Sequence, residues 1–227
     1  MRQLGFSFLN EDDYNINNFI VFDGNNGAYY FLNRSKDDEN ILDNQLIFLS
    51  GEKKCGKTHL GYIWKQQHNA KNLYYDDLFS LNMNDFIKTV NEVIERFDYY
   101  ILDDLRDDFD EEKLLYLINT VFNNSSVMLI ISDFNILKKK ISIKDLKSRI
   151  NAGVNLKIKK LSKTVKTMFI VKLFADRQIN INGDVLKYLT KKLDTNYNVI
   201  FNFVKNIDDI LVSDKNKINL KLIKELI

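Results

Sequence analysis

The sequence predicts an α/β fold in which a core with a mostly parallel five-stranded sheet is followed by a small all-helical domain. Five short apolar segments alternate with segments whose apolar residues recur about every three to four positions. This alternation is typical of a parallel sheet with helices on both faces. After Lys159 the strand-like segments stop and only the helical pattern continues. The 227 residues are enough for one ordinary domain and one small domain.

Each expected element follows from its own pattern of apolar residues. The expected strands are residues 46–50, 72–75, 99–103, 127–132 and 155–158. The expected core helices lie near residues 57–70, 84–96, 111–123 and 143–151. Helical spacing predicts further helices marked by Val165–Leu173, Val185–Leu193 and Val199–Ile207, and a short one near 219–227. A composition shift near Leu161 divides the chain into segments 1–18, 19–160 and 161–227. Tyr74, Tyr75, Tyr99 and Tyr100 are expected in the core.

Composition limits the class of protein. The chain is 45% hydrophobic and 28% charged, which is typical of a globular protein. No apolar segment reaches the ~18 residues of a membrane helix, and no secretory signal is visible. Cys55 is the single cysteine, so a disulfide within the chain is excluded. These features predict a cytoplasmic protein that does not contact a membrane.

The net charge of +2 conceals a basic segment. Residues 138–172 contain 12 basic side chains and a single acidic one, Asp145. Such a segment either forms solvated, lysine-rich faces or attracts the phosphate groups of DNA or of a nucleotide on a neighbouring protein. Both interpretations remain open at this stage.

The segment Gly51–Thr58 reads Gly-Glu-Lys-Lys-Cys-Gly-Lys-Thr and fits the P-loop pattern. An apolar strand, Gln45–Ser50, precedes it and a helical pattern follows, which is the context that the motif requires. Backbone N–H groups of such a loop and the N-terminus of the next helix bind phosphate. Lys57 is expected to reach the β- and γ-phosphates, and the Thr58 hydroxyl to bind Mg²⁺. The alternative is an incidental glycine turn.

Two other apolar segments end in polar side chains. The strand 99–103 delivers Asp103 and Asp104 to its carboxyl end, where open α/β sheets bind ligands. Asp103 is expected to hold Mg²⁺ through water, and Asp104 to orient or deprotonate an attacking water. The strand 127–132 similarly ends in Ser132 and is followed by Asp133, and the P-loop context leads us to expect these side chains beside the γ-phosphate. The alternatives are a solvated acidic loop and a turn-forming Ser-Asp pair.

Arg149 lies in the segment Asp145-Leu-Lys-Ser-Arg-Ile, which is expected to be a short helix before the last strand. It is either an ordinary surface residue or a finger presented to the nucleotide of another subunit. An arginine in that position neutralises charge in the transition state of phosphoryl transfer.

These motifs together resemble an AAA+ ATPase of the DnaA branch with its helical lid. The segment Phe19–Ala28 looks like the part of that branch that lies along the adenine, which implies ATP or ADP with Mg²⁺ as ligands. The resemblance implies that the nucleotide-binding residues are Val21, Asn25, Gly51, Lys53, Lys54, Cys55, Gly56, Lys57, Thr58 and His59. In the lid, Asn198 aligns with a nucleotide-sensing arginine of the family. Asn198 lacks the positive charge of that arginine, which implies that nucleotide binding survives while the chain's own ATP hydrolysis is weak.

The N-terminal segment Gln3-Leu-Gly-Phe-Ser-Phe8 resembles the peptide by which Hda-type regulators of this branch dock on the sliding clamp. Gln3 offers an amide, and Leu4, Phe6 and Phe8 offer apolar anchors for a groove. The alternative is an edge strand or a frayed tail. No DNA-binding helical domain follows the expected lid, which also resembles the Hda-type layout.

Three functions are compatible with these patterns. The leading hypothesis is a regulator that docks on the DNA-loaded sliding clamp and presents Arg149 to ATP bound by the initiator DnaA, with a homo-oligomer as a further possibility. The second is a DNA-stimulated ATPase such as a helicase loader, which uses Asp104 as base and the basic segment 138–172 for nucleic acid. The third is a non-catalytic adaptor in which the nucleotide is structural.

Overall fold

The computed structural model describes residues 14, 16–34, 46–214 and 218–227. The chain divides into two compact units. The core unit contains Gly56–Ile158 together with the preceding segment that ends at Gly51. The lid unit contains Lys159–Ile227 together with the loop residues Glu52–Cys55.

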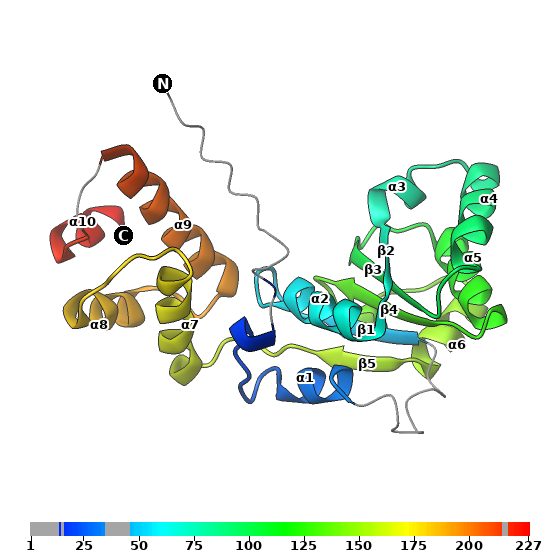
Figure 1. Cartoon of the computed structure of the whole chain (residues 1–227), viewed down its shortest axis with the longest axis horizontal. Coiled ribbons are helices and arrows are strands. Elements are labelled where there is room, and N and C mark those ends of the chain that lie inside the picture. Colours follow the sequence, from blue (N-terminus) through cyan, green and yellow to red (C-terminus); the bar gives the residue numbers. More distant parts are fainter. Residues whose placement is uncertain (1–13, 15, 35–45, 215–217) are drawn as a thin grey trace. The chain divides into compact units, whose positions relative to one another are not determined.

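The core unit is built on a five-stranded sheet in which all neighbouring strands are parallel (Figure 1). The strand order is β2-β3-β4-β1-β5. The strands are β1 (Leu46–Ser50), β2 (Lys71–Tyr74), β3 (Tyr99–Leu105), β4 (Val127–Ser132) and β5 (Val154–Lys157). Every residue of β1 and β4 is buried, as expected for central strands covered on both faces. The predicted α/β class and parallel five-stranded sheet are confirmed.

The edge strand β2 differs from the prediction. It ends at Tyr74, and Tyr75 begins the short helix α3 (Tyr75–Phe79) instead of continuing the strand. Tyr74 is 64% exposed, so its expected place in the core is wrong. The reason is that β2 has a neighbour on one side only and Tyr74 is its last residue. Tyr100, on the more central strand β3, is fully buried as predicted.

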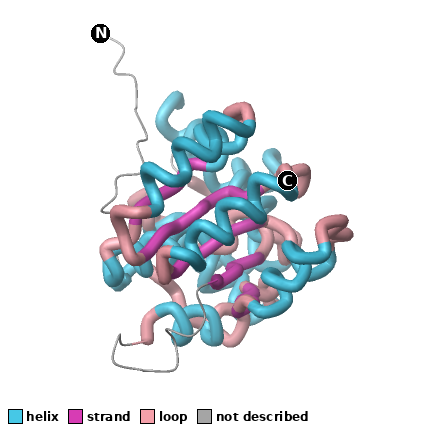
Figure 2. Tube along the Cα trace, turned by 90° about the vertical axis from the view of Figure 1, so that its right-hand side faces the viewer, coloured by secondary structure: helices cyan, strands magenta, loops and turns pink. Residues whose placement is uncertain are grey.

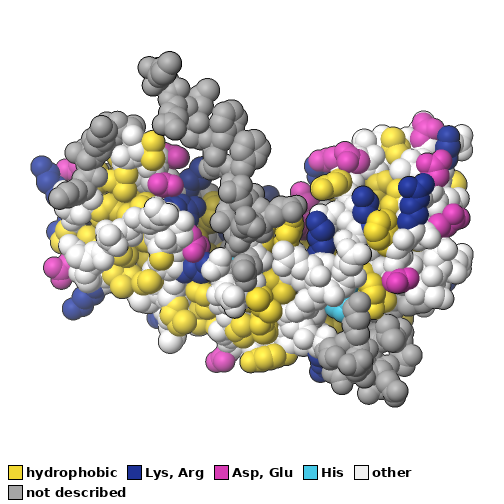
Figure 3. Space-filling view, viewed as in Figure 1, with side chains coloured by type: hydrophobic (Ala, Val, Ile, Leu, Met, Phe, Trp, Pro, Cys, Tyr) yellow, Lys and Arg dark blue, Asp and Glu magenta, His cyan; other side chains and the backbone are white. Residues whose placement is uncertain are grey.

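Helices pack on both faces of the sheet. On one face lie α4 (Met83–Ile94), α5 (Glu111–Asn123) and α6 (Lys144–Ala152). Their apolar side chains form one cluster with alternate residues of the strands, among them Phe48, Leu102 and Ile130. The 3-10 turns η2 (Ile16–Asn18) and η3 (Ile136–Lys138) complete the core elements. On the face shown in Figure 3, acidic and basic side chains are interspersed over α3 and α4, so neither sign of charge dominates there.

The opposite face of the sheet carries α2 (Lys57–His68) and α1 (Asn26–Leu32). Gly61 lets α2 approach β4 closely, because a Cβ atom at that position would lie 2.5 Å from Cδ1 of Ile131. The strands of the core run side by side in Figure 2. The close packing of α2 on β4 thus fixes the position of the N-terminal end of α2, which follows the glycine loop.

The lid unit is all-helical, as predicted. Its helices are α7 (Lys163–Ala175), α8 (Gly183–Lys192), α9 (Tyr197–Asp214) and α10 (Leu220–Leu226). Ser162, Asn182 and Asn219 each accept a hydrogen bond from a backbone N–H in the first turn of the helix that follows. The unit buries apolar side chains from all four helices, namely Ile170, Leu173, Phe174, Val185, Leu189, Ile200, Val204, Ile207 and Ile223. In the described part of the chain, no helix is long and apolar enough to cross a membrane.

Candidate nucleotide-binding site

The strand, loop and helix around the P-loop motif are arranged as the motif requires. β1 ends at Ser50, the loop follows, and α2 begins at Lys57. Gly56 has φ of 99°, in the left-handed region that favours glycine. A Cβ at Gly56 would also lie 3.3 Å from Cε2 of Phe19. The backbone therefore makes a tight turn that brings the N-terminus of α2 to the loop, as phosphate binding needs.

The ammonium group of Lys57 is buried and lies at the end of β4. Lys57 is 7% exposed, and its Nζ is 2.8 Å from Oδ1 of Asp133. β4 pairs directly with β1, with Ser50 opposite Ser132. This pairing brings Asp133, which follows β4, close to Lys57, which begins the helix after β1. Ser132 is also buried, but its hydroxyl donates to the carbonyl oxygen of Phe134 at 2.7 Å. Of the two polar residues predicted beside the γ-phosphate, Asp133 is thus the one whose side chain contacts the lysine.

The two predicted Mg²⁺ ligands lie together. The Thr58 hydroxyl hydrogen-bonds the Asp103 carboxylate, which joins the start of α2 to the end of β3. The β3–β4 register shifts between Leu102 and Leu105. Asp103 and Asp104 therefore lie at an irregularity of the strand, which changes the direction of their side chains. Asp104 has φ of 59°, is exposed, and donates its backbone N–H to Oδ1 of Asp103 at 2.7 Å. A hydroxyl and a carboxylate at this position fit a Mg²⁺ ion that also binds phosphate and water.

Burial raises the pKa of the Asp103 carboxyl above its ordinary value, and this effect exceeds the lowering by the hydrogen bonds from Thr58 and from the Asp104 amide. The folded protein therefore binds this proton more tightly than the unfolded chain does. Under that condition the free energy of unfolding falls as the pH rises from the ordinary pKa through the raised one. The carboxylate charge thus costs stability in the nucleotide-free protein at neutral pH.

The substitution Asp103→Asn should therefore stabilise the nucleotide-free protein while weakening binding of Mg²⁺-nucleotide. We expect a higher thermal midpoint than wild type near neutral pH, with the difference shrinking toward zero below about pH 4. Thermal melts across this pH range measure the effect. The control is Asp108→Asn, which alters an exposed carboxyl that is not among the groups that shift the pKa of Asp103, so the pH dependence should match that of wild type. A lower midpoint for Asp103→Asn at neutral pH would contradict the assignment.

The segment expected along the adenine is held by Asn25, which is 1% exposed. Its Oδ1 accepts from the Phe22 N–H at 2.8 Å, and its Nδ2 donates to the Ile20 carbonyl at 2.8 Å. Val21, which lies between Ile20 and Phe22 in the chain, is 36% exposed. Asn25 therefore folds the segment, while Val21 is left accessible to a base.

Aromatic rings surround the first turn of α2, and sequence reasoning did not predict them. The His59 ring centroid lies 5.2 Å from that of Phe19 and 5.3 Å from that of Tyr14, both edge-on. Tyr14 also stacks on Tyr62 at 5.1 Å. No short motif marks these rings, because they come from three separate segments of the core unit.

A cavity of about 710 Å³ adjoins the acidic pair. Thr58, Asp103 and Asp104 line it together with Tyr74, Asp76 and other side chains at the carboxyl ends of β2 and β3. Sequence reasoning missed the β2 residues. The same logic that found Asp103 would have found them, since Tyr74 to Asp77 also follow the end of a strand.

The remaining predicted loop and lid residues lie in the lid unit. Lys53 is exposed and Cys55 is buried. Lys54 has φ of 65°, and its Nζ lies 4.6 Å from the centroid of the Phe201 ring on α9. Asn198 is in the first turn of α9 and partly exposed. Gln3, Leu4, Phe6 and Phe8 lie outside the described residues.

Arg149 lies far from the P-loop of its own chain. It sits in the last turn of α6, shortly before β5, and β5 pairs Val154 with Ile47 at the amino end of β1. The P-loop follows the carboxyl end of the same strand, so most of the length of β1 separates the two sites, about 10 Å or more. The guanidinium lies 4.7 Å from the centroid of the Phe122 ring, and its Nε is 3.8 Å from Oδ1 of Asp145. The side chain is 34% exposed and therefore accessible to another molecule.

In sequence, the chain is similar to the chromosomal replication initiator protein DnaA. It is 26% identical over 232 residues to DnaA of Buchnera aphidicola subsp. Cinara cedri, covering 94% of this chain and 52% of that protein. It is 25% identical over 203 residues to DnaA of Helicobacter pylori strain P12, covering 82% of this chain and 44% of that protein. The chain thus spans about half the length of these curated relatives. No protein-family model matches it.

In structure, the chain has the fold of the DnaA AAA+ domain. The crystal structure of domain III of Thermotoga maritima DnaA matches with a TM-score of 0.75 at 19% identity, covering 95% of each chain. A structure of DnaA bound to AMPPCP and single-stranded DNA matches with a TM-score of 0.67 at 22% identity, covering 92% of this chain and 69% of that one. The RuvB Holliday junction motor of Thermotoga maritima matches with a TM-score of 0.59 at 17% identity, covering 80% and 60%. The resemblance to the DnaA branch of AAA+ ATPases is confirmed.

Proposed function

We propose that this chain, which is DnaA-like in sequence and has the AAA+ fold, binds ATP or ADP with Mg²⁺ and regulates the initiation of chromosomal replication. It docks on the DNA-loaded sliding clamp and presents Arg149 to ATP held by the initiator DnaA. Hydrolysis of that ATP then switches the initiator off. The observation that carries the proposal is an accessible arginine on α6 at the end of the sheet opposite the chain's own P-loop.

Nucleotide binding is the first part of the proposal. A DnaA of the same fold is bound to AMPPCP. In this chain the Lys57 ammonium contacts the phosphates, and Thr58 and Asp103 hold Mg²⁺, which neutralises phosphate charge when bound. The exposed Val21 borders the base, while Asn25 keeps its segment folded. Since Asn198 carries no charge, the chain hydrolyses its own nucleotide weakly, and the bound nucleotide mainly sets the conformation of the chain.

The clamp partner rests on the peptide Gln3–Phe8. We expect the double substitution Gln3→Ala/Leu4→Ala to abolish retention by immobilised sliding clamp, because it removes the amide and one apolar anchor of a short peptide. The matched control is Asp12→Asn, which changes a nearby residue outside the peptide and should bind like wild type. Equal retention of the double variant and wild type would contradict this partner.

A second function is favoured by exposed lysines in the core unit. Lys138, Lys140, Lys144 and Lys147 of the basic segment are all exposed on or near η3 and α6. This second function is a DNA-stimulated ATPase in which these lysines bind DNA phosphates and Asp104 acts as the base. Titration of DNA at several salt concentrations distinguishes the two functions, since phosphate contacts give an affinity that falls steeply with salt. Strong DNA-stimulated ATP turnover by the isolated chain would favour this second function.

A further inference from the structure

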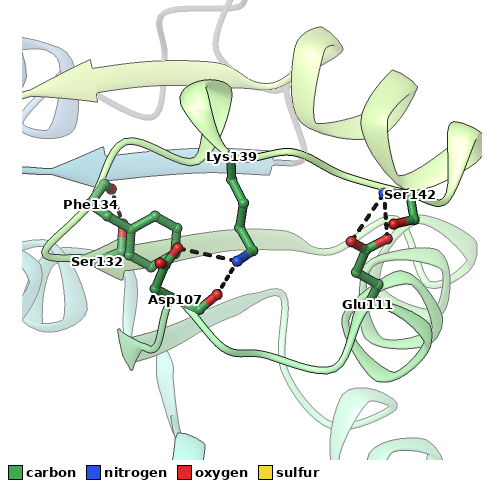
Figure 4. A network of polar contacts seen from close by, with 6 residues as sticks. All are labelled: Asp107, Glu111, Ser132, Phe134, Lys139 and Ser142. Atoms are coloured by element: carbon green, nitrogen blue, oxygen red, sulfur yellow. Dashed lines mark hydrogen bonds and ion pairs between the residues drawn. The ribbon is translucent and has the colours of Figure 1, made fainter.

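The helix that carries Arg149 is fastened at its N-terminus by a side chain from another element. Glu111, in the first turn of α5, accepts hydrogen bonds from the backbone N–H groups of Ser142 and Ile143. The Oε2 atom of Glu111 is 2.9 Å from each nitrogen, and Oε1 is 3.1 Å from that of Ser142 (Figure 4). The N-cap of α6 is Ile143, whose side chain has no acceptor. Glu111 therefore supplies the cap that the local sequence of α6 lacks.

A second contact joins the same two segments. Lys139, on the segment before α6, donates from Nζ to the backbone carbonyl and to Oδ1 of Asp107 (Figure 4). The same ammonium lies 5.3 Å from the centroid of the Phe109 ring, and Phe109 stacks on Phe134. The segment between β4 and α6 is thus tied along its length to the loop between β3 and α5.

Both tied segments begin at the nucleotide site. The β3–α5 loop follows Asp103 and Asp104, and the β4–α6 segment follows Asp133, the partner of Lys57. α6 then runs from Ile143 toward the other end of the sheet, where Arg149 lies about 9 Å further along the axis. Leu146 and Ile150 are buried in the core cluster, so α6 is packed against the core between Ile143 and Arg149.

We infer that Glu111 is a positioning residue for Arg149: its carboxylate holds the N-terminus of α6 against the start of α5, which follows the strand that carries the Mg²⁺-binding Asp103. This inference rests on the proposed function, and it specifies how the chain's own nucleotide regulates the finger. Phosphates that draw Lys57 away from Asp133 act on one end of the tied segments, and α6 carries the displacement to Arg149.

The test combines amide exchange of the isolated protein with a rate measurement. In Glu111→Ala, the Ser142 and Ile143 amides should exchange about 10-fold faster or more, because each loses a charged acceptor. Stimulated hydrolysis of DnaA-bound ATP should fall about 10-fold at saturation, with an unchanged half-saturating concentration. Glu111→Gln, which keeps one carbonyl oxygen, should be intermediate. Glu112→Ala, which removes an acidic side chain from the same helix turn, should behave like wild type.

Each outcome decides the inference. Wild-type exchange at Ser142 and Ile143 in a folded Glu111→Ala protein overturns it, as does a wild-type rate in that variant when Arg149→Ala is inactive. If Arg149→Ala stimulates like wild type, the proposed function itself fails. The exchange measurement involves no second protein, so in that case it still shows whether Glu111 holds α6. Thermal midpoints of all variants establish that the compared proteins are folded.

Discussion

Arg149→Ala should reduce the stimulated hydrolysis of DnaA-bound ATP at least about 10³-fold, which is the lower end of the range for a missing arginine finger. The guanidinium stabilises charge that develops only in the transition state, so the loss should appear in the maximal rate. The binding of the chain to clamp and its own nucleotide affinity should be unchanged, because Arg149 is at the opposite end of the sheet from the P-loop. A single-turnover assay with clamp, DNA and nucleotide-loaded DnaA measures the rate.

Two substitutions serve as controls for this prediction. Arg149→Lys should also be nearly inactive, because an ammonium cannot reproduce the planar, bidentate guanidinium. Lys147→Ala removes an exposed cation from the same helix and should keep the wild-type rate. The contacts of Arg149 with Phe122 and Asp145 are partly exposed, so each contributes about 1 kcal/mol or less and the variant should stay folded. Equal rates for Arg149→Ala and wild type would show that the arginine is not a finger.

Lys57→Ala should weaken binding of ATP and ADP about 100-fold or more, because the ammonium supplies charged hydrogen bonds to the phosphates. Calorimetric titration of nucleotide-stripped protein in Mg²⁺ measures the affinity. The protein should remain folded. The Asp133 side chain, which loses its ion pair with Lys57, is 34% exposed and can be solvated by water.

The matched control for Lys57→Ala is Asp133→Asn. It breaks the same 2.8 Å ion pair but keeps the ammonium, so its nucleotide affinity should change less than about 10-fold. Wild-type affinity in Lys57→Ala would remove the basis of the nucleotide-site assignment. If Lys57→Ala loses nucleotide yet still stimulates DnaA like wild type, the bound nucleotide has a structural role and the chain acts as an adaptor.

Elements with a strong local pattern were predicted well, and short ones were not. The central strands β1 and β4 are continuous apolar segments, and their predicted bounds agree with the structure. The helices α1 and α3 have 7 and 5 residues, too few for an amphipathic period to be recognised. The exposure of Tyr74 depended on which strand lies at the edge of the sheet, and no local pattern records strand order.

The candidate site shows the same division between local and distant information. The loop Gly51–Thr58 was evident from sequence because its chemistry resides in a continuous backbone turn and one helix start. The carboxylates Asp103 and Asp133 were predicted as strand tips, but their contacts with Thr58 and Lys57 depended on strand order. Both contacts join residues that are more than 40 positions apart in the chain.

The α/β class, the phosphate-binding loop and the C-terminal helices could therefore be predicted from the sequence, because each depends on neighbouring residues through periodicity or a contiguous motif. The pairing of Lys57 with Asp133, the cap that Glu111 provides to α6, and the distance of Arg149 from its own P-loop emerged only in three dimensions. Parallel strands require long crossover connections, so the residues that meet at one edge of such a sheet come from distant parts of the chain.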